Sequence, residues 1–66
     1  MNDEQKMALL ESAQCSITEF IKCWENCVEQ CKHEISNNVT NVTIAYNNLE
    51  RAIYYFSRAK RELDGL

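Results

Sequence analysis

Residues 31–45 read CKHEISNNVTNVTIA, and the polar run at 36–38 inside this stretch decides the fold. Apolar residues recur at helical spacing on both sides of the run, but the register beyond it is shifted by four residues. Asn tolerates the left-handed backbone conformation, so Ser36-Asn37-Asn38 is typical of a turn. We therefore predict two helices joined by a tight turn at 36–38. One unbroken helix is the alternative, because no Gly or Pro enforces a break there.

The residues before the turn predict a long helix over about residues 3–35. Asn2 precedes two acidic residues, which is typical of a helix N-cap, and Lys32 and His33 suit a helix C-terminus. The apolar positions alternate at intervals of three and four, as they do on one face of a helix. They are Leu10, Ala13, Ile17, Phe20, Trp24, Cys27 and Cys31.

The residues after the turn predict a second helix over about 39–63. Its apolar positions show the same alternation, and Lys60, Arg61 and Gly65 suit its C-terminal end. These positions are Val42, Ala45, Leu49, Ala52, Phe56, Ala59 and Leu63. The predicted fold is therefore all-α: a single domain over residues 1–66, formed by an antiparallel, coiled-coil-like helical hairpin.

A turn centred near residue 38 sets which residues of the two helices face each other. Facing residue numbers should add up to about 76, which pairs Trp24 with Ala52, Cys31 with Ala45 and Phe20 with Phe56. Most of these pairs match a large side chain with a small one, as close packing favours. We therefore expect Trp24, Cys27 and Cys31 to lie in the interior.

One side of this hairpin is predicted to carry an apolar strip that two helices cannot bury. A contiguous apolar surface on a small domain marks a partner site. A 66-residue chain also buries little apolar surface alone, so we expect either a homodimer or a complex with another protein to complete the fold. The predicted partner-binding residues are Ile21, Val28, Ile35, Val39, Tyr46 and Ile53.

The four cysteines allow two interpretations. Cys27 and Cys31 fall at interior positions, Cys23 on the rim and Cys15 on the exposed back, so packing accounts for the inner pair. A metal site is the alternative, but Cys23 and Cys31 are roughly 12 Å apart along a helix axis. One tetrahedral ion cannot bind Cys23, Cys27 and Cys31 of one helix together. A homodimeric metal-binding or thiol protein would need cysteines from both chains.

Charge and composition limit the remaining functions. The net charge of −3 argues against general attraction to nucleic acid or anionic membranes. Arg51, Arg58 and Arg61 with the interleaved Tyr54 and Tyr55 could form an RNA-binding surface of a four-helix dimer. The alternative is that these arginines are solvated and complement the helix dipole.

No catalytic constellation is recognisable in the chain, so we expect no enzyme activity, no cofactor and no small-molecule substrate. The chain shows no apolar stretch of membrane-spanning length and no secretory signal. We therefore expect a cytoplasmic protein whose cysteines are reduced.

The stretch NLERAIYYF at 48–56, with Leu49, Ala52, Ile53 and Phe56, carries a resemblance to a known family. Together with the length and hairpin layout, it resembles the small cytosolic co-chaperones of type III secretion needle subunits. That resemblance implies a helical hairpin that pairs with a repeat-helix chaperone and keeps the needle protein monomeric. The row of cysteines is not part of that family's pattern.

Overall fold

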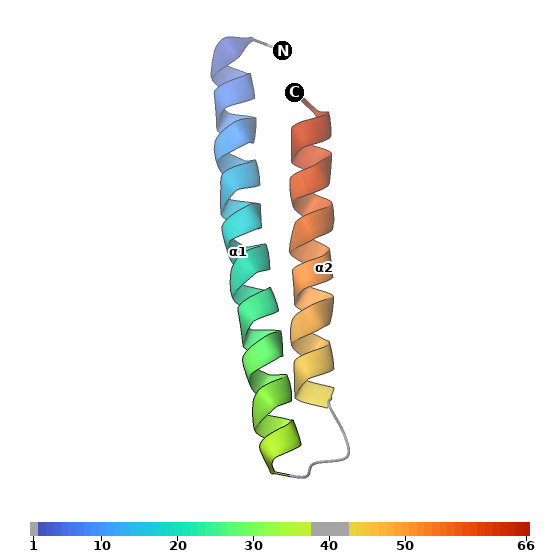
Figure 1. Ribbon diagram of the computed structural model, residues 1–66. Helices are drawn as coiled ribbons and strands as arrows, with labels where there is room; N and C mark the ends of the chain where they lie inside the picture. Colours follow the sequence, from blue (N-terminus) through green and yellow to red (C-terminus); the bar gives the residue numbers. More distant parts are fainter. Residues whose placement is uncertain (1, 38–42) are drawn as a thin grey trace.

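The protein is an antiparallel hairpin of two helices (Figure 1). The computed structural model describes residues 2–37 and 43–66, with α1 spanning Asp3–Ser36 and α2 spanning Thr43–Asp64. The two helices run side by side, so both chain ends lie at the same end of the hairpin. This confirms the predicted all-α hairpin and rules out one unbroken helix. Val39, Asn38 and the predicted helix start at residue 39 lie outside the described residues.

The N-terminus of α1 is closed by the N-cap that the sequence predicted. The side chain of Asn2 accepts a hydrogen bond from the backbone N–H of Gln5 at 2.8 Å. The Gln5 side chain in turn accepts one from the Asn2 N–H at 3.1 Å. This reciprocal capping box satisfies two N–H groups that a helix start otherwise leaves unpaired.

The C-terminus of α1 lies one residue beyond the predicted end. Asn37 caps it, with its backbone N–H and its side-chain amide both donating to the carbonyl of His33, at 3.1 and 2.8 Å. The backbone of Asn37 has φ −99° and ψ 11°. It therefore does not adopt the left-handed conformation that we invoked for the turn asparagines.

The predicted register of the two helices is confirmed by contacts across the hairpin. The rings of Phe20 and Phe56 lie with their centroids 5.7 Å apart. Ser16 donates a hydrogen bond to Glu62 at 2.7 Å, and Ser12 donates to the same carboxylate. The numbers of these paired residues add up to about 76, as predicted, although Ser36, which we expected in the turn, is the last residue of α1.

Small residues, rather than large apolar ones, fill the contact between α1 and α2. Ala13 and Ala52 are 0% and 1% exposed, whereas no large side chain of the described residues is fully buried. We call this set the small-residue seam. It comprises Ala13, Ser16, Cys23 and Cys27 of α1 and Ala45, Ala52 and Ala59 of α2.

The seam corrects the predicted interior. Trp24 is 50% exposed and Ile17 is 40% exposed, Cys31 is half-buried, and Cys23, which we expected on the rim, is buried. On α2, Phe56 and Leu63 are also exposed. Each helix is thus turned about its axis by roughly 60° from the predicted orientation, at about 100° per residue. The physical reason is that small side chains on both helices let the backbones approach more closely than Trp24 and Ile17 would.

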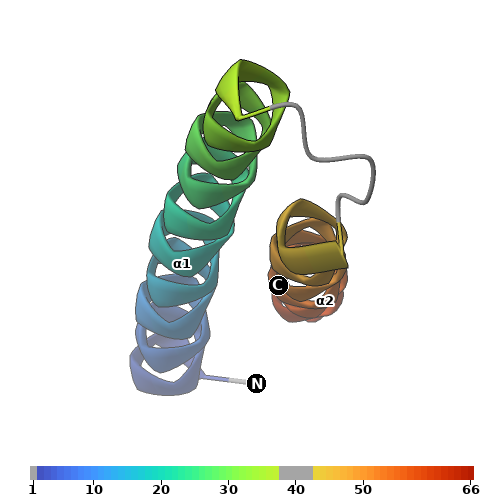
Figure 2. The same ribbon diagram turned by 90° about the horizontal axis from the view of Figure 1, so that it is seen from below.

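The hairpin is a single layer, with extents of 54 × 13 × 10 Å. Figure 2 looks nearly along α2 and shows α1 inclined beside it. A layer one helix thick has no interior apart from the line where its two helices touch. Its remaining apolar side chains must therefore lie on the surface.

Candidate functional site

One face of the hairpin collects most of its exposed large apolar side chains. On each helix these residues recur at intervals of three and four on the same side of the small-residue seam, except for one interval of seven on each helix, where exposed Gln14 and Lys60 interrupt the series. We call this surface the apolar face. Its exposed members are Ile17, Ile21, Trp24 and Ile35 of α1 and Tyr46, Ile53, Phe56 and Leu63 of α2. Half-buried Leu10, Val28, Cys31 and Leu49 lie between them.

The structure places the predicted strip within this larger face. Ile21, Ile35, Tyr46 and Ile53 are exposed, Val28 is half-buried, and Val39 lies outside the described residues. A shallow depression on this face is lined by Tyr46, Leu49, Ile53 and their neighbours Glu50 and Tyr54. The predicted strip is therefore one side of the apolar face, and the rest of this face extends from the strip to the small-residue seam.

Sequence reasoning missed four members of the apolar face: Ile17, Trp24, Phe56 and Leu63. We assigned them to the interior because their hydrophobicity and spacing are typical of core positions. The signal that could have found them is the size of their neighbours. Ser16 and Cys23 lie one position before Ile17 and Trp24, and they suit a close contact with the alanines of α2 better than the larger side chains do.

The opposite face is polar and is organised around one carboxylate. Glu62 of α2 accepts hydrogen bonds from Ser12 and Ser16 of α1, and its Oε1 lies 3.8 Å from the Nε of Arg58. The hydrogen bonds from Ser12 and Ser16, and the nearby arginines, lower the pKa of Glu62 below its ordinary value of 4.5. This arrangement joins the two helices and fixes their register.

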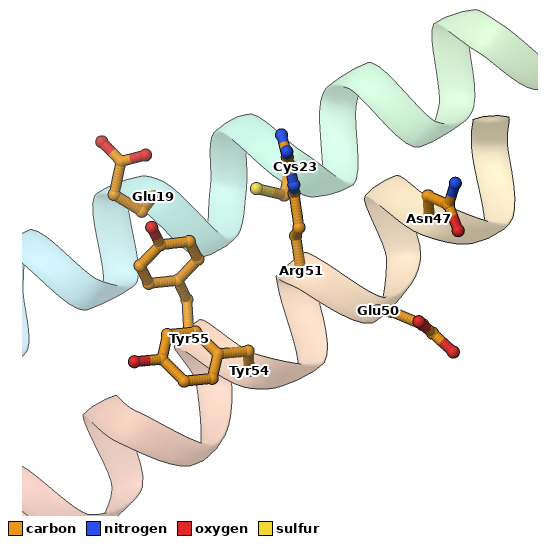
Figure 3. A pocket seen from close by; sticks show the side chains of 7 residues that line it. All are labelled: Glu19, Cys23, Asn47, Glu50, Arg51, Tyr54 and Tyr55. Carbon is orange, nitrogen blue, oxygen red and sulfur yellow. The ribbon is translucent and has the colours of Figure 1, made fainter.

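A groove crosses both helices beside Cys23 (Figure 3). Figure 3 shows Tyr55 lying between the helices and Arg51 reaching from α2 toward α1. The rings of Tyr54 and Tyr55 meet edge to face, with centroids 5.1 Å apart. The groove is lined by Glu19, Cys23, Asn47, Glu50, Arg51, Tyr54 and Tyr55.

This groove brings together the residues of two alternative functions. Cys23 is one of the three candidate metal-binding or thiol residues, and Arg51, Tyr54 and Tyr55 belong to the candidate RNA-binding surface, whose Arg58 and Arg61 do not line the groove. The lining also includes Glu19 and Glu50, which place negative charge beside the single arginine. An acidic lining opposes the binding of a phosphate backbone, which requires clustered positive charge.

The cysteines are all free thiols in the structure. Cys15 is exposed, Cys23 and Cys27 are buried in the seam and Cys31 is half-buried. Burial, together with the neighbouring Cys31 and the charge of Glu34, raises the pKa of the Cys27 thiol. A thiol in such surroundings is a poor nucleophile at neutral pH. Within residues 2–37 and 43–66, no three Cys, His, Asp or Glu side chains are grouped so that they could hold a metal ion.

Neither α1 nor α2, as far as the structure describes them, contains a stretch apolar and long enough to cross a lipid bilayer. Comparison of the chain with known protein families, with curated proteins and with solved structures gives no match. The apolar face is therefore the feature of this molecule from which a function can be argued.

Proposed function

We propose that this chain is a small, non-enzymatic interaction module with a chaperone-like or adaptor-like role, which binds another protein molecule through its apolar face. The main observation behind the proposal is that small side chains are buried and large apolar side chains are exposed, the reverse of the usual distribution. Apart from Glu34, the buried residues of the described chain are alanine, serine and cysteine, whereas isoleucine, tryptophan, tyrosine and phenylalanine are exposed. Large contiguous apolar surfaces of this kind mark protein interaction sites.

The composition of the face supports this role. Interfaces are enriched in aromatic residues, and hot spots within them are enriched in Trp and Tyr. Trp24, Tyr46 and Phe56 contribute aromatic rings to the apolar face. Isoleucines surround these rings and would exclude water from the contact.

The test places one charge on the apolar face and one on the opposite side of the same helix. Ile53 and Ile44 are 56% and 57% exposed, but Ile44 lies away from the apolar face. We expect Ile53→Glu to abolish association, measured as the mass in solution of the chain alone and of the complexes that co-purify with it. Ile44→Glu should leave association unchanged, and both variants should remain helical by circular dichroism.

A second substitution on α1 makes this test independent of α2. Val28→Glu places a charge at the half-buried centre of the same face and should also abolish association. Complexes that survive both Ile53→Glu and Val28→Glu would show that the binding surface lies elsewhere.

The resemblance to type III secretion co-chaperones suggests one specific form of this role. In that case the apolar face would bind the repeat-helix chaperone that holds the needle subunit. Co-expression of this chain with the chaperone and needle subunit of the same organism should then give one stable complex. We expect Ile53→Glu to release the chain from that complex, and an absence of any complex would exclude the secretion role.

A further inference from the structure

We propose that a second copy of this chain covers the apolar face, packed face to face and antiparallel, so that two hairpins form a four-helix bundle. This inference rests on the proposed function, because it names the protein that the same face binds.

The surface of the single hairpin is too large for a chain of this mass. Its accessible surface is 5097 Å², whereas a folded monomer of 7.7 kDa is expected to expose about 4,300 Å². The difference, about 800 Å², is close to the area that each partner buries in a standard protein interface. A second layer of the same size would supply that burial.

The apolar face is complementary to itself about a twofold axis that crosses it at Ile21, perpendicular to the helices. Residues of α1 then face residues of the partner's α1 whose numbers add up to about 42. Ile17 lies close to the partner's Trp24, Leu10 close to the partner's Cys31, and Ile21 close to the partner's Ile21. Apolar residues therefore meet apolar residues at these positions of α1, whereas Val28 lies opposite the partner's exposed Gln14.

The same axis also sets the pairing of α2 with the partner's α2. Since residues facing each other within one hairpin add up to about 76, facing residues of α2 and the partner's α2 add up to about 110. Leu49 then lies close to the partner's Leu63, and Phe56 close to the partner's Phe56. One axis thus brings together apolar residues of both helices, although Tyr46 then faces the partner's Asp64 and Ile53 faces the partner's Ser57.

Exposed charges on and beside the face agree with this register. Lys32 at the edge of α1 comes opposite the partner's Glu11, and Lys60 of α2 comes opposite the partner's Glu50. Twofold symmetry makes each pair twice. All four residues are exposed in the single hairpin. Lys60 lies within the apolar face itself, between Phe56 and Leu63 at helical spacing.

The other face-to-face arrangement places like charges together. A twofold axis parallel to the helices would stack α1 on the partner's α2. Glu11 would then lie near the partner's Asp64, and Glu25 near the partner's Glu50. Because like charges opposite each other disfavour association, the charge pattern selects the antiparallel arrangement.

The experiment measures the mass and the dimer dissociation constant of the reduced chain by analytical ultracentrifugation. We expect about twice the mass of 7.7 kDa, and a monomeric but helical chain after Ile21→Glu. Lys32→Glu should raise the dissociation constant about tenfold, because two attractive contacts become repulsive. Adding Glu11→Lys to Lys32→Glu should bring the constant back to within about threefold of the original.

Lys22→Glu is the matched control for the charge reversal. Lys22 pairs with Glu19 at 3.6 Å just as Lys32 pairs with Glu29 at 3.5 Å, and both lysines are exposed. The two substitutions therefore change net charge equally and each removes one contact within α1. Lys22 lies farther from the apolar face, so Lys22→Glu should leave the dissociation constant within about twofold of the original.

The outcomes separate this inference from the proposed function. The chain could be monomeric alone but form a complex with another protein, and Ile53→Glu could abolish that complex. This result would contradict the homodimer and support the proposed interaction module. A dimer for which Glu11→Lys does not rescue Lys32→Glu would overturn the antiparallel arrangement. A dimer that persists in both Ile21→Glu and Ile53→Glu would overturn the use of this face altogether.

Discussion

Glu62 is a single carboxylate that connects the two helices on the polar face. Ser12 and Ser16 of α1 donate hydrogen bonds to it, and Arg58 of α2 lies beside it. Each of these contacts favours the charged form over the protonated one. The pKa of Glu62 in the folded chain is therefore lower than in the unfolded chain.

The stability that Glu62 contributes should depend on pH. Because its folded pKa lies below the ordinary value of 4.5, this contribution is present above pH 4.5 and is lost as the pH falls through the folded pKa. We expect Glu62→Gln to lower Tm at pH 7, and the difference in Tm from the original chain to shrink as the pH falls below 4.5 and through the folded pKa. Thermal unfolding of both chains at a series of pH values measures this difference in Tm.

Ser16→Ala provides the control for this pH dependence. It removes one of the two hydroxyl groups that donate to Glu62 and leaves the carboxylate in place. In the Ser16→Ala background, the pH-dependent difference in Tm that Glu62→Gln produces should be smaller. A difference that is unchanged would show that Ser16 does not contribute to the lowered pKa.

The thiols should differ in reactivity in the order of their exposure. Cys15 is exposed, whereas Cys27 is buried in the small-residue seam and has a raised pKa. Because thiolate at an accessible sulfur is the reacting form, we expect Cys15 to be alkylated first and Cys27 last by iodoacetamide at neutral pH. Peptide mass mapping over time gives the order. Faster labelling of Cys27 than of Cys15 would contradict the buried position of Cys27.

At the scale of the helix, close contact depends on the alanines of α2. Ala45, Ala52 and Ala59 are spaced by seven residues and are all buried against α1. A larger side chain at one of these positions would push the helices apart along their length. The close contact between α1 and α2 therefore requires small side chains at these three positions.

Ala52→Leu tests this dependence on small residues. Since Ala52 is almost fully buried, the added atoms cannot be accommodated without displacing α1. We expect the free energy of unfolding to fall by about 1–3 kcal/mol, measured by urea denaturation at fixed protein concentration. Ala8→Leu makes the same change at an exposed position of α1 and should stay within about 0.5 kcal/mol.

The sequence predicts the helices and their register well but the rotation of each helix poorly. The capping residue Asn2 and the pairing of Phe20 with Phe56 follow from local chemistry and from the length of the connection. The assignment of Trp24 to the interior failed for a different reason. Periodicity locates a broad apolar stripe on a helix, but the part of it that meets the other helix depends on side-chain size across the contact.

The same limit applies to the candidate site. Ile21 and Ile53 were predicted on the partner surface because they lie beyond the assumed core, and they are exposed on the apolar face. Ile17, Phe56 and Leu63 were not predicted on this surface. The repeating pattern does not distinguish a residue that packs within the hairpin from one that packs on a second layer. Both kinds of packing select large apolar residues at helical spacing.

At the scale of the whole molecule, a single layer of two helices should depend on association for its stability. If two chains fold and associate together, dilution favours the unfolded chain. We expect Tm to rise by about 5 °C for each tenfold increase in protein concentration, as measured by circular dichroism. The Tm of the Ile21→Glu chain should not change with concentration, and a constant Tm in the original chain would contradict coupled folding and association.

The exposed indole of Trp24 gives the molecule an internal optical reporter. It is the single tryptophan of the chain and is half-exposed on the apolar face. Fluorescence excited at the red edge of the absorption band therefore comes from this face alone. Its emission should shift to shorter wavelength and resist quenching by acrylamide whenever the face is occupied, so occupancy can be followed in real time without attaching a label.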